Sequence, residues 1–160
     1  MNADILKNIA HTYGTPSYIF NVDELESRLN TIKQILGEGI DVLYAMKANP
    51  FLVPVMSRLG MRFEVCSPGE FAICENEHVN MQDIVLSGVN KERADIEHVM
   101  DDCGGVGIYT VESVRHFQLL ASMAEKRSTV IHVLLRVTSG NQFGLDEEDI
   151  CLLYTSDAAD

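Results

Sequence analysis

Residues 41–66, DVLYAMKANPFLVPVMSRLGMRFEVC, decide the fold that the sequence predicts. One apolar run begins at Asp41 and a second begins at Arg62, and a helix-like segment at 51–60 lies between them. Short apolar strands that alternate with helices are typical of right-handed βαβ units with a parallel sheet. We therefore interpret this stretch as the first strand, first helix and second strand of an α/β domain.

The same pattern continues toward the C-terminus, where strand-like runs start roughly 21 to 25 residues apart. The runs begin near Asp41, Arg62, Ile84, Val106 and Val130, and the expected helices cover 51–60, 69–78, 92–102 and 112–126. No glycine-rich fingerprint follows the first strand, so the pattern favours a (β/α)₈ TIM-type barrel over a dinucleotide-binding fold. Residues 41–150 would supply the first five units of an incomplete barrel.

The first 40 residues do not share this repeat. We expect an amphipathic helix at 3–12, a turn at 13–16, a short strand at 17–20 and a helix from Asp23 that stops at Gly37. This segment, 1–40, would lead into the barrel as a separate N-terminal strand and helix.

The last ten residues, CLLYTSDAAD at 151–160, are similar to the translation of a transposase-end adapter used in sequencing libraries. We expect them to be foreign to the protein, so that the natural sequence breaks off near Ile150 and the chain is a fragment. A natural C-terminal tail is the alternative.

Composition limits the classes of function. The net charge of −12, without a basic cluster, argues against nucleic-acid binding, and the apolar runs are too short to cross a membrane. The four cysteines show no C-x-x-C spacing and no histidines have ligand spacing, so we expect no metal site. Scattered thiols of this kind indicate a reduced, cytoplasmic protein. We expect Cys66, Cys74 and Cys103 to pack as small hydrophobic residues rather than to act as nucleophiles.

Lys47 is the first candidate for catalysis. In a barrel the active site lies at the carboxyl ends of the strands, and Lys47 follows the first predicted strand on the same face as Leu43 and Ala45. A partly desolvated lysine amine can form a Schiff base with an aldehyde. A lysine that merely extends its charged end into solvent at a strand end is the alternative.

Several motifs resemble one family in the same order. They are Tyr13–Phe20, Tyr44–Asn49, Phe63–Glu70, Leu86–Lys91, Val111–Ser113, and Leu135–Val137 followed by Gln142–Gly144. Together they resemble the fold-type III pyridoxal-phosphate decarboxylases that act on diaminopimelate, ornithine and arginine, which have an alanine racemase-like barrel. The resemblance implies that Lys47 covalently holds pyridoxal 5'-phosphate and that the substrate is an amino acid, with meso-diaminopimelate expected. It also implies a homodimer for the full-length protein.

The resemblance extends to two charged residues. Glu64 lies between Phe63 and Val65 in a predicted apolar strand, so we expect it on the opposite face from both. It stands where the family usually has aspartate, and we expect its carboxylate to support Lys47 electrostatically; an ion pair with Arg62 is the alternative. Arg136 stands where the family has an arginine that reaches the cofactor ring, and a structural salt bridge is the alternative. The ring-stacking histidine and the phosphate loop of the family are expected on later strands.

Two smaller residues are further candidates for cofactor binding. Ser67 and Glu70 form a capping box for a helix, which explains both without catalysis, although the resemblance places this turn close to the cofactor. Gly88 follows the third predicted strand, where a residue without a side chain lets the backbone approach the pocket; an ordinary turn is the alternative.

Three other functions stay open. Glu64 and the run 138–144 keep a decarboxylase of a carrier-bound or siderophore-precursor amino acid in view. An alanine-racemase-like enzyme would need a tyrosine base from another domain. A non-catalytic pyridoxal-phosphate-binding barrel would lack the N-terminal extension at 13–20.

Overall fold

The computed structural model describes residues 2–140 and 143–156, and the chain divides into two compact units, 1–41 and 42–160. The first unit contains two helices, α1 (Ala3–Tyr13) and α2 (Val22–Leu36). Asparagine side chains cap both helices at their N-termini, and both end at a glycine with positive φ, Gly14 and Gly37. These helices confirm the two predicted from hydrophobic spacing and capping residues.

The predicted strand at 17–20 is wrong. These residues form neither helix nor strand, and Tyr18 is fully exposed. A strand is stabilised by ladder hydrogen bonds to a neighbour, and the described part of the chain pairs nothing with this segment. β-branched and aromatic residues favour strands, but residue type alone does not form a strand without a partner to pair with.

The second unit is built on a parallel five-stranded sheet with the order β1-β2-β3-β4-β5. The strands are β1 (Leu43–Ala45), β2 (Arg62–Val65), β3 (Ile84–Leu86), β4 (Ile108–Val111) and β5 (Val133–Leu135). The spatial order equals the chain order, as in a barrel wall, whereas dinucleotide-binding sheets reverse direction partway. This confirms the prediction of a partial TIM-type barrel.

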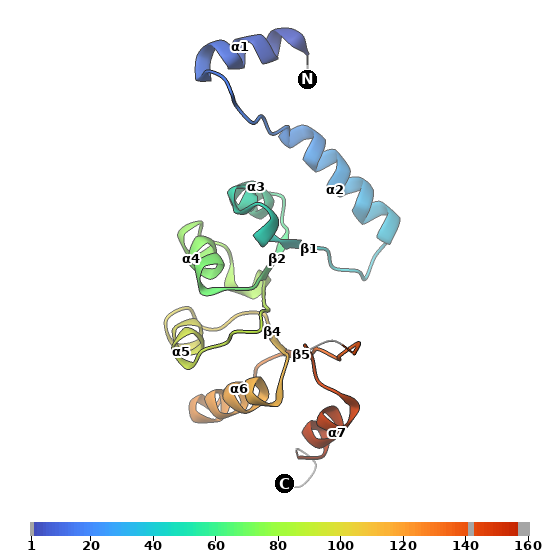
Figure 1. Cartoon of the computed structure of the whole chain (residues 1–160), viewed down its shortest axis with the longest axis vertical. Helices are drawn as coiled ribbons and strands as arrows, with labels where there is room; N and C mark the ends of the chain where they lie inside the picture. Colours follow the sequence, from blue (N-terminus) through green and yellow to red (C-terminus); the bar gives the residue numbers. More distant parts are fainter. Residues whose placement is uncertain (1, 141–142, 157–160) are drawn as a thin grey trace. The chain divides into compact units, whose positions relative to one another are not determined.

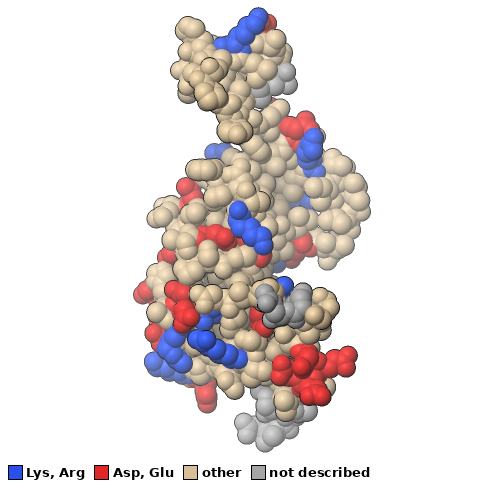
Figure 2. All heavy atoms as spheres, in the orientation of Figure 1, with Lys and Arg blue, Asp and Glu red and all other residues tan. Residues whose placement is uncertain are grey.

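Helices connect the strands and lie in a row along one face of the sheet (Figure 1). They are α3 (Val53–Arg58), α4 (Pro68–Asn76), α5 (Arg93–Asp101) and α6 (Val114–Arg127), with short 3₁₀ turns η1 (Met46–Ala48), η2 (Pro50–Leu52) and η3 (Met81–Asp83). Each predicted helix of this region is thus present. Lysine and arginine side chains are interspersed with aspartate and glutamate over the surface that Figure 2 shows.

The alternation of side chains divides the sheet into an apolar and a polar face. In β2, Phe63 and Val65 are fully buried while Glu64 is only partly buried, and in β4 Tyr109 and Val111 are buried beside a half-buried Thr110. The buried side chains form the core with the helices, which is the main source of stability. The other face is thereby left for the polar residues, as predicted for Glu64.

The end of the described chain forms a helix, α7 (Glu147–Ser156), which crosses the predicted boundary at 150. Leu153 of this helix is buried, but that observation does not test the origin of residues 151–160, which stays a prediction. Residues 157–160 lie outside the described residues, as do 141 and 142 of the motif 138–144. None of the described helices is long and apolar enough to cross a membrane.

Candidate active site

A cavity of about 510 Å³ lies at the carboxyl ends of the strands. Its walls are contributed by the ends of all five strands or the residues after them, as expected for a barrel active site. The lining residues are Lys47, Glu64, Cys66, Val85, Ser87, Gly88, Val89, Asn90, Thr110, Glu112, Leu134, Leu135 and Arg136. Four of the five predicted site residues therefore meet here: Lys47, Glu64, Gly88 and Arg136.

Lys47 lies in a constrained turn rather than in the strand. β1 ends at Ala45, and Lys47 is the middle residue of η1, directly after the fully buried Met46. The hydroxyl of Tyr44 donates a hydrogen bond to the carbonyl of Asn49 at 2.8 Å and closes this turn. The exposed Lys47 side chain is thus carried by a backbone that is fixed on both sides.

Glu64 faces the cavity beside Lys47. Its carboxylate accepts hydrogen bonds from the thiol of Cys66, at 2.9 Å, and from the hydroxyl of Ser87. Burial raises the pKa of Glu64, but these two hydrogen bonds and the positive charge of Lys47 outweigh it, so the pKa lies below its usual value. Glu64 therefore holds a negative charge next to the lysine.

Ser67 does not line the cavity with the other four. Its hydroxyl accepts a hydrogen bond from the backbone N–H of Glu70 at 3.3 Å and caps α4, as the capping box predicts. The Glu70 carboxylate accepts a hydrogen bond from the backbone N–H of Cys66 at 2.7 Å. In the usual capping box it would accept from the N–H of the N-cap residue, Ser67. The box thus fixes the backbone that carries Cys66 toward Glu64, and a contact of Ser67 with a cofactor stays a prediction.

Gly88 is required by the close approach of two chain segments. Its φ is +100°, and a Cβ atom at this position would lie 2.2 Å from the carbonyl oxygen of Cys66. The Gly88 N–H donates a hydrogen bond to Oε1 of Glu112 at 3.1 Å. This turn therefore brings the ends of β2, β3 and β4 together at the cavity wall.

Two buried charged residues of the site were not among the predicted ones. Lys91 and Glu112 are only 5% and 7% exposed. The Lys91 ammonium donates to the carbonyl oxygen of Gly88 at 2.6 Å and to the Thr110 hydroxyl at 3.2 Å, and burial lowers its pKa. Strand alternation could have identified Glu112, because Thr110 and Glu112 fall on the face opposite Val111.

Arg136 forms the structural salt bridge, which was the alternative to a cofactor contact in the sequence prediction. Its Nη1 donates to Oε2 of Glu112 at 2.8 Å, and its guanidinium lies 5.4 Å from the centre of the Phe143 ring. The salt bridge is thus present, and the same side chain lines the cavity. A contact of Arg136 with a cofactor stays a prediction. The strand pattern also favours a hydrogen-bonded core role for His132, four residues before Arg136, but the structure leaves this histidine exposed.

The cysteines do not have the properties of nucleophiles. Burial raises the pKa of the Cys74 thiol to about 11, and burial with the neighbouring Glu75 raises that of Cys103 to about 11. Burial and Glu64 also raise the pKa of Cys66. Their thiols are therefore protonated at neutral pH, in agreement with the predicted packing roles, although Cys66 also donates a hydrogen bond within the site.

Three comparisons show which known proteins this chain is similar to. Residues 22–148 match the family model described as pyridoxal-dependent decarboxylase, pyridoxal binding domain. A diaminopimelate decarboxylase of Halalkalibacterium halodurans is 32% identical over 137 residues, which cover 82% of this chain and 31% of that protein. A decarboxylase of Niallia circulans that acts on an L-glutamyl group on the BtrI acyl-carrier protein is 27% identical, over 90% of this chain and 34% of that protein.

Solved structures share the fold. A point mutant of diaminopimelate decarboxylase from Helicobacter pylori, solved with L-lysine, superimposes with a TM-score of 0.81 at 18% identity. The alignment covers 96% of this chain and 43% of that one. The chain spans about a third of the length of the curated relatives it matches.

Proposed function

Because the chain belongs to the family of pyridoxal-dependent decarboxylases, through their pyridoxal-binding domain, we propose that it forms the cofactor-holding part of an amino-acid decarboxylase. The observation that carries this proposal is the pair of Lys47 and the ionised Glu64 in one cavity at the carboxyl ends of the strands. Family membership confirms the cofactor class that the sequence predicted.

The donor set of the cavity fits pyridoxal phosphate. A primary amine, Lys47, is the group that binds an aldehyde, and the apolar side chains of Val85 and Leu134 offer surface for a flat ring. When bound, the cofactor supplies an electron sink for the electron pair that carbon dioxide leaves behind. Lys47 would hold it, and Glu64 and Arg136 would lie around it.

Each charged residue then has a definite task. Glu64 orients Nζ of Lys47 by its charge, and Cys66 and Ser87 keep the Glu64 carboxylate in place by their hydrogen bonds. Glu112 accepts hydrogen bonds from Arg136 and from the Gly88 N–H, so it fixes the guanidinium at the cavity wall. Catalysis requires such prepositioned charges, because reorganisation during the reaction costs rate.

We propose meso-diaminopimelate as the substrate and lysine as the product. The support is the agreement of several relatives, from Halalkalibacterium halodurans to Aquifex aeolicus, that carry the name diaminopimelate decarboxylase. The relative from Niallia circulans favours an amino acid on a carrier protein as the second candidate. A homodimer, as the resemblance implies, and a cytoplasmic location, as the scattered thiols indicate, are part of the proposal for the whole enzyme.

Release of labelled carbon dioxide from a panel of amino acids tests the proposal on the whole enzyme that contains this chain. We expect release from meso-diaminopimelate with added pyridoxal phosphate, and little from lysine, ornithine or arginine. Lys47→Ala should abolish release, whereas the control Lys33→Ala, on exposed α2, should retain it. Racemisation of alanine, or cofactor binding without any release of carbon dioxide, would contradict the proposal.

A further inference from the structure

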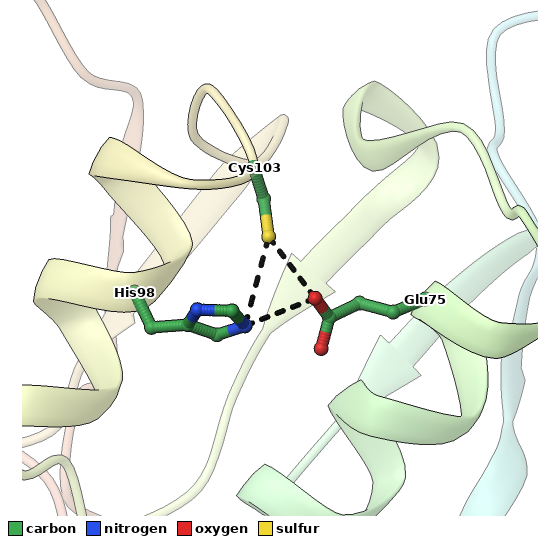
Figure 3. A group of neighbouring side chains, drawn as sticks. All are labelled: Glu75, His98 and Cys103. Atoms are coloured by element: carbon green, nitrogen blue, oxygen red, sulfur yellow. Dashed lines mark hydrogen bonds and ion pairs between the residues drawn. The ribbon is translucent and has the colours of Figure 1, made fainter.

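A second cluster of chemically active side chains lies in the helical layer outside the sheet. Glu75 near the end of α4, His98 on α5 and Cys103 just after α5 point toward one another (Figure 3). None of the three lines the Lys47 cavity. The sequence prediction of no metal site rested on spacing along the chain, which does not address side chains that two helices and a loop bring together.

The distances in this cluster are close to those of a metal site. Nε2 of His98 lies 2.9 Å from Oε1 of Glu75, and Sγ of Cys103 lies 3.3 Å from the same oxygen and 3.8 Å from Nε2. Tetrahedral zinc with bonds of about 2.0–2.3 Å separates its ligand atoms by about 3.3–3.6 Å. Shifts of roughly half an ångström would thus admit an ion at the centre.

A second observation supports a ligand at this place. Nδ1 of His98, the ring nitrogen that faces away from the cluster, lies 2.7 Å from Oδ2 of Asp102. Metal-binding histidines commonly donate their other N–H to a carboxylate, which orients the ring and makes the free nitrogen a better ligand. The ring also packs edge-on against Phe71, at 6.1 Å between centroids. The histidine is therefore held in the orientation that a metal requires.

We propose that Glu75, His98 and Cys103 bind one divalent transition-metal ion of the zinc type, with water as the fourth ligand. The half-exposed side chain of His98 leaves the site open to solvent. Binding replaces the thiol proton of Cys103 by the metal ion, and that proton passes to the solvent; no electron is transferred. The ion would tie α4 to α5 and stabilise the folded chain by mass action.

Cobalt(II) is a suitable probe, because a cobalt–thiolate bond absorbs in the near ultraviolet. The full chain, free of pyridoxal phosphate, is titrated with cobalt(II) chloride. We expect a charge-transfer band that saturates at one ion per chain, disappears when zinc(II) displaces cobalt, and is absent in urea. Zinc should also raise the midpoint of thermal unfolding.

Variants identify the ligands, with folding of each checked by circular dichroism. Cys103→Ser should abolish the band, whereas Cys151→Ser, at an exposed cysteine on α7, should leave it unchanged. Asp102→Asn should weaken zinc binding about 10-fold, and His98→Ala about 100-fold or more. A band that survives Cys103→Ser or that Cys151→Ser removes would overturn the proposal. So would a folded chain without any band, which would leave only a hydrogen-bonded triad.

Discussion

The polar groups of the cavity and those of the helical layer differ in how they are surrounded. Glu112 lines the cavity, and Lys91 donates to the carbonyl of Gly88 in the cavity wall. Both are almost fully buried, and each has several partners. In the helical layer, the side chain of His98 is 45% exposed. A buried charge without partners is costly, whereas an exposed one is solvated. The cavity therefore needs a fixed set of contacts, and the outer cluster can exchange its contacts for a ligand.

The largest expected effect comes from the tight turn at Gly88. Gly88→Ala should destabilise the protein by about 4 kcal/mol, because its Cβ would collide with the Cys66 backbone and because φ is positive. Gly104→Ala is the control, since Gly104 also has a positive φ of +75° but an open surrounding. It should cost about 1 kcal/mol. Equal urea midpoints for the two variants would show that the turn at Gly88 tolerates movement.

Removal of the buried carboxylate should have the next largest effect. Glu112→Leu removes the carboxylate that pairs with Arg136 and leaves the Lys91 ammonium buried. We therefore expect the free energy of unfolding to fall by about 3 kcal/mol. Glu92→Leu breaks an exposed contact to Arg115 at 3.8 Å and should cost at most about 0.5 kcal/mol. A double variant, Lys91→Met with Glu112→Leu, should recover part of the loss. If Glu112→Leu and Glu92→Leu reduced the free energy of unfolding equally, burial would not distinguish the cavity from the exposed surface.

Helix capping should give a smaller effect, equal at two positions. Ser67 and Ser113 cap α4 and α6 in the same way, at 3.3 and 3.2 Å from the backbone N–H three residues later. Ser67→Ala and Ser113→Ala should each cost about 1 kcal/mol. Titration with pyridoxal phosphate separates the roles: a loss of cofactor affinity in Ser67→Ala alone would assign Ser67 to the cofactor site.

The smallest effect is a change in acid stability from Glu64. Because its folded pKa is lowered, its ionised form stabilises the protein fully above the unfolded value of about 4.3, and this contribution is lost as pH falls through the lower folded pKa. Glu64→Gln should therefore flatten stability against pH below about 5, and Glu64→Asp should retain most of the slope. Urea unfolding at a series of pH values below about 5 measures the slope of stability against pH for each variant. An unchanged slope in Glu64→Gln would mean that the carboxylate interacts with nothing in the folded state.

The sequence predicted the parts that depend on periodicity. Alternation placed Phe63 and Val65 in the core and Glu64 on the other face, and helical spacing with Gly37 located α2. It failed where partners far apart in the chain decide the outcome. Residues 17–20 have strand-like side chains but pair with no strand in the described part of the chain. Lys91 and Glu112 both bind Gly88, whose turn brings two strand ends together.

The candidate site shows the same limit. Lys47, Glu64, Gly88 and Arg136 were found through motifs and converge in the structure. Glu75, His98 and Cys103 belong to no common motif, and their proximity depends on how α4 packs beside α5. Side chains that act together across helices are thus visible only after the fold is known.

Covalent trapping of the cofactor tests directly whether Lys47 holds pyridoxal phosphate. The whole enzyme is incubated with pyridoxal phosphate, reduced with borohydride and digested, and the modified lysine is identified by mass spectrometry. We expect the reduced cofactor to be attached to Lys47 in stoichiometric amount, and Lys47→Ala to carry none. Modification of Lys91, or scattered modification of surface lysines that persists in Lys47→Ala, would contradict this assignment.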